Sequence, residues 1–176
     1  CSVRRQRQMC IRDSPITNNK AKFSFKQLKE KVSKFAGALS NQGVKKGDRV
    51  IIYMPMVPEA VVAMLACGRI GAIHSVVFGG FASNELASRI DDSKAKLLVT
   101  ASCGFEPGRT VEYRPLVDGA LKLAKHKVEK VIFFQRQGHE IKLNSPLEIS
   151  WDESLSNAKD TDCVEMGSNE FAYILY

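Results

Sequence analysis

Residues 52–81 read Ile-Tyr-Met-Pro-Met-Val-Pro-Glu-Ala-Val-Val-Ala-Met-Leu-Ala-Cys-Gly-Arg-Ile-Gly-Ala-Ile-His-Ser-Val-Val-Phe-Gly-Gly-Phe. The stretch begins inside an apolar run, 49–53, which predicts a buried strand. Pro58 suits the first turn of a helix over 58–69, and because that helix is apolar nearly all round we expect it to be buried on most sides. Residues 72–77 predict a second strand, which a Gly-Gly corner follows. This order is typical of an α/β ligand-binding fold.

The rest of the chain repeats the alternation of strands and helices. We expect further helices over 24–43, 83–91, 113–126 and 152–158, further strands over 96–100, 130–134 and 171–176, and an exposed loop or edge hairpin over 135–150. This alternation predicts an α/β domain with a mostly parallel sheet and helices on both faces.

The helix over 24–43 has the clearest end signals. Ser24 and Gln27 have the spacing of a capping box, and Gly43 lies where a glycine stops a helix.

Charge and hydropathy limit the function classes. No apolar run approaches the roughly 20 residues of a membrane span, and no secretory signal is evident at the start, so we expect no membrane partner. The net charge is +7, but residues 1–13 hold four arginines and one aspartate, so the remainder carries +4. This mild excess, without aromatic residues interleaved among the basic ones, argues against a nucleic-acid binder.

The first residues have an unusual composition. Residues 4–13 back-translate without a mismatch to the end of a common transposase-type sequencing adapter. We therefore interpret 1–13 as a non-native, adapter-derived tail and 14–176 as native sequence. A remnant of an Arg-rich mitochondrial transit peptide is the alternative.

The metal-ligating residue types are scattered. The five cysteines form no C-x-x-C pair, and no histidine stands at metal-ligand spacing to them or to another histidine. We expect free thiols in a reducing compartment and no metal site in this chain.

Two segments at strand ends are candidate ligand contacts, since parallel sheets bind ligands beyond their carboxyl ends. Residues 78–83 contain the Gly-Gly corner, which admits positive φ and close approach of a ligand to the backbone. Residues 101–109 predict a small-residue loop that ends in Arg109, whose guanidinium suits phosphate oxygens. From the residues alone, a simple tight turn and a solvated surface arginine explain the same features.

Over 14–176 the chain resembles the short-chain acyl-CoA synthetases, the acetyl- and propionyl-CoA branch of the adenylate-forming enzymes. The motifs that carry this resemblance are Tyr-Met-Pro-Met-x-Pro-Glu, Met-Leu-Ala-Cys-x-Arg-Ile-Gly-Ala-x-His-Ser and Phe-Gly-Gly-Phe. The resemblance implies part of the large N-terminal domain of such an enzyme. It also implies contacts with coenzyme A, at the corner Phe78, Gly79 and Gly80 and at the segment Glu106, Pro107, Gly108 and Arg109, with Arg109 as a phosphate ligand.

The implied reaction joins a short carboxylate to coenzyme A at the expense of ATP, with Mg²⁺ held outside this chain. The phosphate loop, the acyl pocket and the catalytic lysine of the family are absent from it. We therefore expect a fragment without catalytic residues that is inactive alone, from a mitochondrial matrix or cytoplasmic enzyme. Glu106 stands where acetyl-CoA synthetases commonly carry arginine, which favours propionate over acetate. The alternative is a non-catalytic module that binds coenzyme A or a nucleotide.

Overall fold

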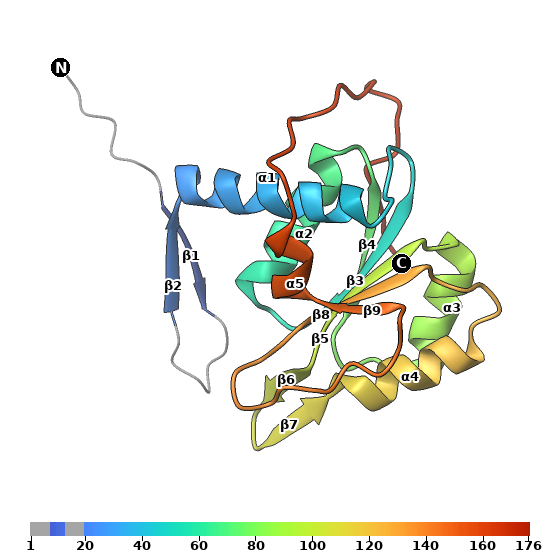
Figure 1. Ribbon diagram of the computed structural model, residues 1–176. Coiled ribbons are helices and arrows are strands. Elements are labelled where there is room, and N and C mark those ends of the chain that lie inside the picture. Colours follow the sequence, from blue (N-terminus) through green and yellow to red (C-terminus); the bar gives the residue numbers. More distant parts are fainter. Residues whose placement is uncertain (1–7, 13–19) are drawn as a thin grey trace.

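A six-stranded parallel sheet organises the molecule, as the computed structural model shows (Figure 1). The structure describes residues 8–12 and 20–176. In spatial order the strands are β10 (Tyr173–Ile174), β4 (Ile73–Phe78), β3 (Arg49–Met54), β5 (Leu97–Ala101), β8 (Lys130–Phe134) and β9 (Glu148–Ser150). Every pair of neighbouring strands in this sheet is parallel. The predicted α/β class is confirmed.

Helices cover both faces of the sheet (Figure 1). They are α1 (Phe25–Asn41), α2 (Pro58–Arg69), α3 (Ser83–Ser93), α4 (Tyr113–Leu123) and α5 (Trp151–Ser156). The chain steps from β3 outward to β4 and then crosses back to β5 on the other side of β3. Because parallel crossovers are right-handed, this reversal places α2 on one face and α3 and α4 on the other. Helices α1 and α5 lie on the face of α2, where α1 packs against both α2 and α5.

The core lies around the central strands. All of β5 is buried, as is β3 from Val50 onward. The largest fully buried side chains of the core include Tyr53, Phe35 and Phe133. Such two-sided burial is what continuous apolar runs in a parallel sheet require. On the α1 face, the ring of Phe35 stacks on that of Trp151 at 3.8 Å.

The predicted end signals of α1 are confirmed. The Ser24 hydroxyl accepts from the Gln27 N–H at 3.2 Å, and the Gln27 side chain accepts from the Ser24 N–H at 2.8 Å. Gly43 has φ of +84° just beyond the helix. This left-handed conformation ends the helix without the strain that a Cβ would add.

Several sequence predictions were wrong in detail. The end of the segment 101–109 is the start of an antiparallel hairpin, β6 (Cys103–Glu106) with β7 (Arg109–Glu112). The final strand is confined to two residues. Most of 135–150 is a loop, as one of the two expectations for it predicts, but its last three residues form a parallel edge strand. Helix α4 ends at Leu123.

Helix α2 is less covered than predicted. Leu65 is 46% exposed, and Gly68 is exposed beside it. These residues line an apolar groove shared with α1. The all-apolar pattern of the helix predicts burial but does not reveal which side lacks a covering element.

A further hairpin, β1 (Gln8–Arg12) with β2 (Lys20–Ser24), precedes α1 and was not predicted. The interpretation of residues 1–13 stays a prediction, since only 8–12 of them are among the described residues. Within the described part of the chain, no helix is long and apolar enough to cross a membrane.

Candidate functional site

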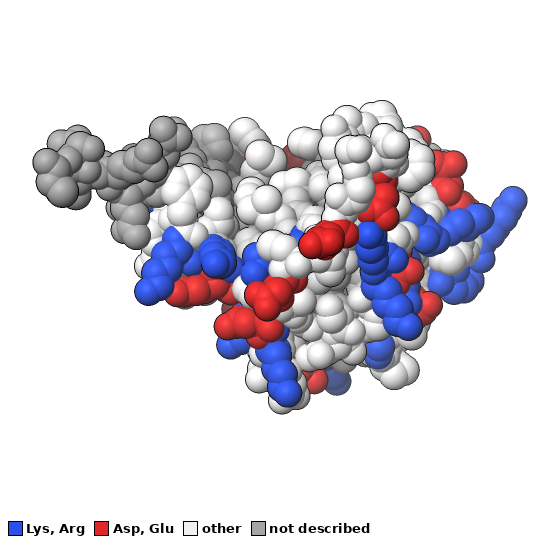
Figure 2. Space-filling view, turned by 90° about the horizontal axis from the view of Figure 1, so that it is seen from above, with Lys and Arg blue, Asp and Glu red and all other residues white. Residues whose placement is uncertain are grey.

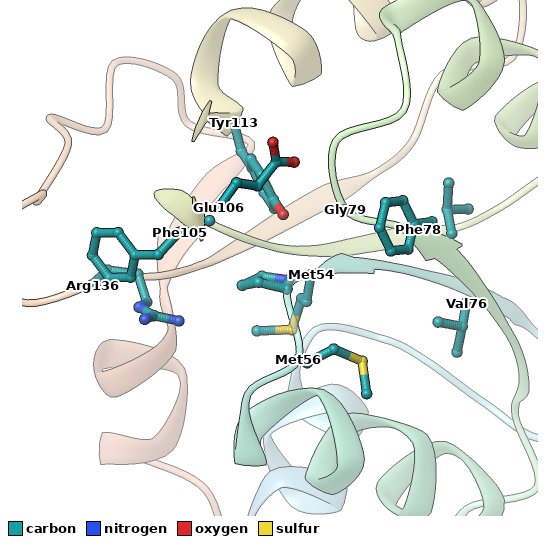
Figure 3. A pocket seen from close by; sticks show the side chains of 12 residues that line it. Met54, Met56, Val76, Phe78, Gly79, Phe105, Glu106, Tyr113 and Arg136 are labelled. Carbon is teal, nitrogen blue, oxygen red and sulfur yellow. The ribbon is translucent and has the colours of Figure 1, made fainter. Parts of the chain in front are cut away.

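A cavity of about 220 Å³ lies beyond the carboxyl ends of β3 and β4 (Figure 3). Met54 and Phe78, the last residues of these two strands, line one side of it. Phe105 and Glu106 of hairpin β6–β7 line the other. The cavity lies near the point where the strand order reverses, which is the usual ligand position in an open α/β sheet.

The hydroxyl of Tyr53 holds the glycine corner in place through two hydrogen bonds. Its hydroxyl donates to the Phe81 carbonyl at 2.8 Å and accepts from the Gly80 N–H at 3.2 Å. Burial raises the pKa of Tyr53, so its phenol stays protonated and able to donate. Gly80 has φ of +111°, which favours glycine, as the sequence predicts for this corner.

Tyr113 fills the space that two other glycines leave open. A Cβ on Gly79 would lie 2.1 Å from the Tyr113 hydroxyl oxygen, and a Cβ on Gly104 would lie 2.6 Å from it. The ring also packs against that of Tyr53, with centroids 5.0 Å apart. Burial is the main cause that raises the pKa of Tyr113 above its ordinary value of 10.0. The phenol is therefore a neutral packing group that joins the corner to the hairpin.

Ser102 closes the base of the hairpin. Its N–H donates to the Phe134 carbonyl at 2.9 Å, and its carbonyl accepts from the Tyr113 N–H at 3.0 Å. Its hydroxyl accepts from the Arg136 N–H at 2.9 Å. These three bonds tie β5, β8 and the start of α4 together, and so give the hairpin a rigid base.

The hairpin tip carries the predicted Glu-Pro-Gly-Arg segment. Pro107 and Gly108 form the turn, with φ of +77° at Gly108, and Glu106 pairs with Arg109 across it. Glu106 Oε2 accepts from Arg109 Nε at 2.8 Å and lies 2.7 Å from the terminal guanidinium nitrogen Nη2.

The structure brings the two predicted segments together. Phe78, Gly79 and Glu106 line the cavity. Glu106 Oε1 lies 3.4 Å from the position of a Cβ on Gly80. Arg109 does not line the cavity, but it is paired with Glu106, which does. Corner and hairpin tip thus form one continuous surface, which we call the strand-end site.

Sequence reasoning missed three residues of this site: Tyr53, Tyr113 and Arg136. Arg136 is only 6% exposed, lines the cavity and lies over the Phe105 ring at 4.7 Å. Its place just after strand 130–134 was a usable signal, because that position lies at the carboxyl end of the sheet. The roles of the two tyrosines depend on contacts with distant glycines, which the sequence does not display.

Arg69, His74 and Arg89 do not line the cavity. Arg89 pairs with Glu85 and lies between the rings of Phe81 and Tyr176. Arg69 donates to the carbonyl of Thr161. His74 lines the groove between α1 and α2.

Metal-ligating side chains do not gather in the part of the chain that is described. Within residues 8–12 and 20–176, no group of three His, Cys, Asp or Glu is placed to hold a metal ion.

Known proteins resemble this chain over most of its length. The chain is 54% identical over 167 residues to the human acyl-CoA synthetase short-chain family member 3, mitochondrial, a match that covers 94% of this chain and 24% of that protein. It is 45% identical over 161 residues to the acetyl-coenzyme A synthetase of Shewanella oneidensis, covering 90% of this chain and 25% of that one. The chain thus spans about a quarter of the length of the curated relatives it matches.

A solved structure has the same fold. Acetoacetyl-CoA synthetase from Streptomyces lividans superposes with a TM-score of 0.79 at 22% identity, over 90% of this chain and 24% of that one. The family model of AMP-binding enzymes matches residues 3–176. The expected resemblance to short-chain acyl-CoA synthetases is confirmed, and the chain belongs to the family of AMP-binding enzymes.

Proposed function

We propose that this chain is the N-terminal portion of an ATP-dependent short-chain acyl-CoA synthetase, in which the strand-end site forms one wall of the coenzyme A site. The observation that carries the proposal is the meeting of the Gly79-Gly80 corner with the Glu106–Arg109 turn. A corner that admits close backbone approach and an arginine at its edge suit a nucleotide with phosphate groups.

The proposed reaction has two steps. A carboxylate oxygen attacks the α-phosphorus of ATP and displaces pyrophosphate, which gives an acyl-adenylate. The thiol of coenzyme A then loses its proton and attacks the acyl carbonyl, and AMP leaves. Arg109 acts in the second step only, as a ligand to a phosphate of coenzyme A, and Phe78, Gly79 and Gly80 supply the surface beside it.

The proposed substrates are ATP, coenzyme A and a short carboxylate, with propionate favoured over acetate. The Glu-Pro-Gly-Arg form of residues 106–109 supports this preference. Mg²⁺, which neutralises phosphate charge in such reactions, belongs in this proposal to residues outside those described here. The proposed compartment is the mitochondrial matrix or the cytoplasm. The similar human protein, which is named as mitochondrial, supports the first of these.

We propose that nucleic acid is not among the partners of this chain. On the face seen in Figure 2, Lys and Arg side chains alternate with Asp and Glu and do not form a continuous basic surface. A phosphate backbone needs a basic surface of that kind.

The experiment is to sequence the transcript through both ends of the reading frame and to express the protein that it encodes. We expect acyl-CoA formation that requires ATP, coenzyme A and a short carboxylate, with propionate used faster than acetate. The 176-residue chain, assayed in parallel, should form no acyl-CoA. A complete protein that binds coenzyme A without forming acyl-CoA would replace this proposal with the non-catalytic module.

A further inference from the structure

The backbone of the hairpin imposes the pairing of Glu106 with Arg109. The two residues are directly opposed at the last rung of the β6–β7 ladder, with the turn between them. Opposed residues in an antiparallel pair have their Cβ atoms about 5 Å apart. The register therefore keeps the two charged groups within reach of each other, and they lie 2.7 and 2.8 Å apart.

The same carboxylate also faces the glycine corner. One oxygen of Glu106 contacts Arg109, and the other lies 3.4 Å from where a Cβ on Gly80 would be. Glu106 thus lies between the corner and the guanidinium. An anionic group that reaches Arg109 along the corner has to displace this carboxylate and then lie close to its negative charge.

We infer that Glu106 tunes the affinity of the strand-end site: it competes with phosphate for Arg109 and lowers the affinity for the phosphate-bearing end of the ligand. The inference rests on the proposed function, in which Arg109 binds a phosphate of coenzyme A. A phosphate group of a ligand can reach both side chains from solvent, because that of Arg109 is 71% exposed and that of Glu106 is 35% exposed. Exposed ion pairs are weak, so we expect an effect of about three- to fivefold in affinity.

The test is a double-mutant cycle with Glu106→Gln and Arg109→Gln, since glutamine keeps the length of Glu106 and removes its charge. Coenzyme A is titrated calorimetrically into the protein encoded by the complete reading frame, as wild type, each single variant and the double variant. We expect Glu106→Gln to lower the Kd for coenzyme A about three- to fivefold. In the Arg109→Gln background the same change should alter the Kd by less than about 1.5-fold.

A matched control removes a carboxylate from another exposed ion pair. Lys46 and Glu170 lie 2.9 Å apart, and Lys46 precedes the amino end of β3, at the opposite end of the sheet from the site. Glu170→Gln should leave the Kd for coenzyme A unchanged. An equal gain in this variant would show an effect of net charge alone and would overturn the inference.

Other outcomes separate the two proposals. If coenzyme A binds and Glu106→Gln leaves the Kd unchanged or raises it, Glu106 does not compete for Arg109, and the inference fails while the proposed function stands. If neither the wild type nor any variant binds coenzyme A, the proposed function itself fails.

Discussion

Single residues set the geometry of the strand-end site through close packing. Gly79 is needed because the hydroxyl of Tyr113 occupies the place of a side chain, and Gly80 is needed because its φ is positive. The sequence predicts the second requirement, since paired glycines are typical of corners. It cannot predict the first, because Tyr113 is 34 positions away along the chain.

Gly79→Ala should destabilise the chain by about 1–3 kcal/mol, because the new methyl group would lie 2.1 Å from the Tyr113 hydroxyl and 2.9 Å from the Met54 carbonyl oxygen. Urea unfolding measures this loss. Tyr113→Phe in the same chain should recover part of it, since it removes the nearest atom. Gly68→Ala is the control: nothing lies within 4 Å of its Cβ position on α2, so it should raise stability by up to about 1 kcal/mol. Equal losses in both alanine variants would contradict this packing account.

His74 should make stability depend on pH. Burial lowers the pKa of its imidazole from the ordinary 6.5, and among the described residues its Nδ1 has no hydrogen-bond partner. Below pH 6.5 the unfolded chain therefore binds a proton that the folded chain resists. Stability from this group is present above pH 6.5 and is lost as the pH falls through that value toward the lower folded pKa.

The measurement is the urea midpoint of wild type, His74→Gln and His139→Gln at pH 7.5 and 5.5. We expect the fall in midpoint between these pH values to be smaller in His74→Gln than in wild type. The exposed His139 serves as the control. A fall of the same size in His74→Gln would show that His74 does not cause it.

At the level of strands and helices, the sequence predicts best what is buried on both sides. The runs at 49–53, 96–100 and 130–134 lie within a residue of the observed β3, β5 and β8, because continuous apolar runs have few alternatives. The edge strands β9 and β10 were missed or overextended, since short edge strands need few apolar residues. Hairpin β6–β7 was read as a loop because its turn, Pro107-Gly108, gives a clear signal whereas its short strands do not.

The capping box of α1 offers a test of the local signals. Ser24→Ala should lower stability by about 1 kcal/mol, because it leaves the Gln27 N–H without its acceptor. Ser40→Ala, near the other end of the same helix, removes only a bond from the serine hydroxyl to the Ala36 carbonyl, and should be neutral or slightly stabilising. Chemical denaturation of both variants measures the difference. Similar losses would mean that the box contributes nothing specific.

For the molecule as a whole, the reversal of strand order connects fold and function. It brings the segment after β4 and the hairpin after β5 to the same edge, although 25 positions separate Gly79 from Gly104. Alternating strands and helices predict the parallel sheet and the edge at which ligands bind. They do not predict the strand order, and so they could not show that the glycine corner and Arg109 form one surface.

In the proposed function, the strand-end site serves the coenzyme A step and not the ATP step. The most direct measurement compares the two half-reactions in the protein encoded by the complete reading frame, as wild type and Arg109→Gln. We expect carboxylate-dependent ATP–pyrophosphate exchange to stay within about twofold of wild type, while the KM for coenzyme A rises about tenfold, the cost of one charge-assisted phosphate contact. An unchanged KM for coenzyme A, or an equal loss of both half-reactions, would contradict the account.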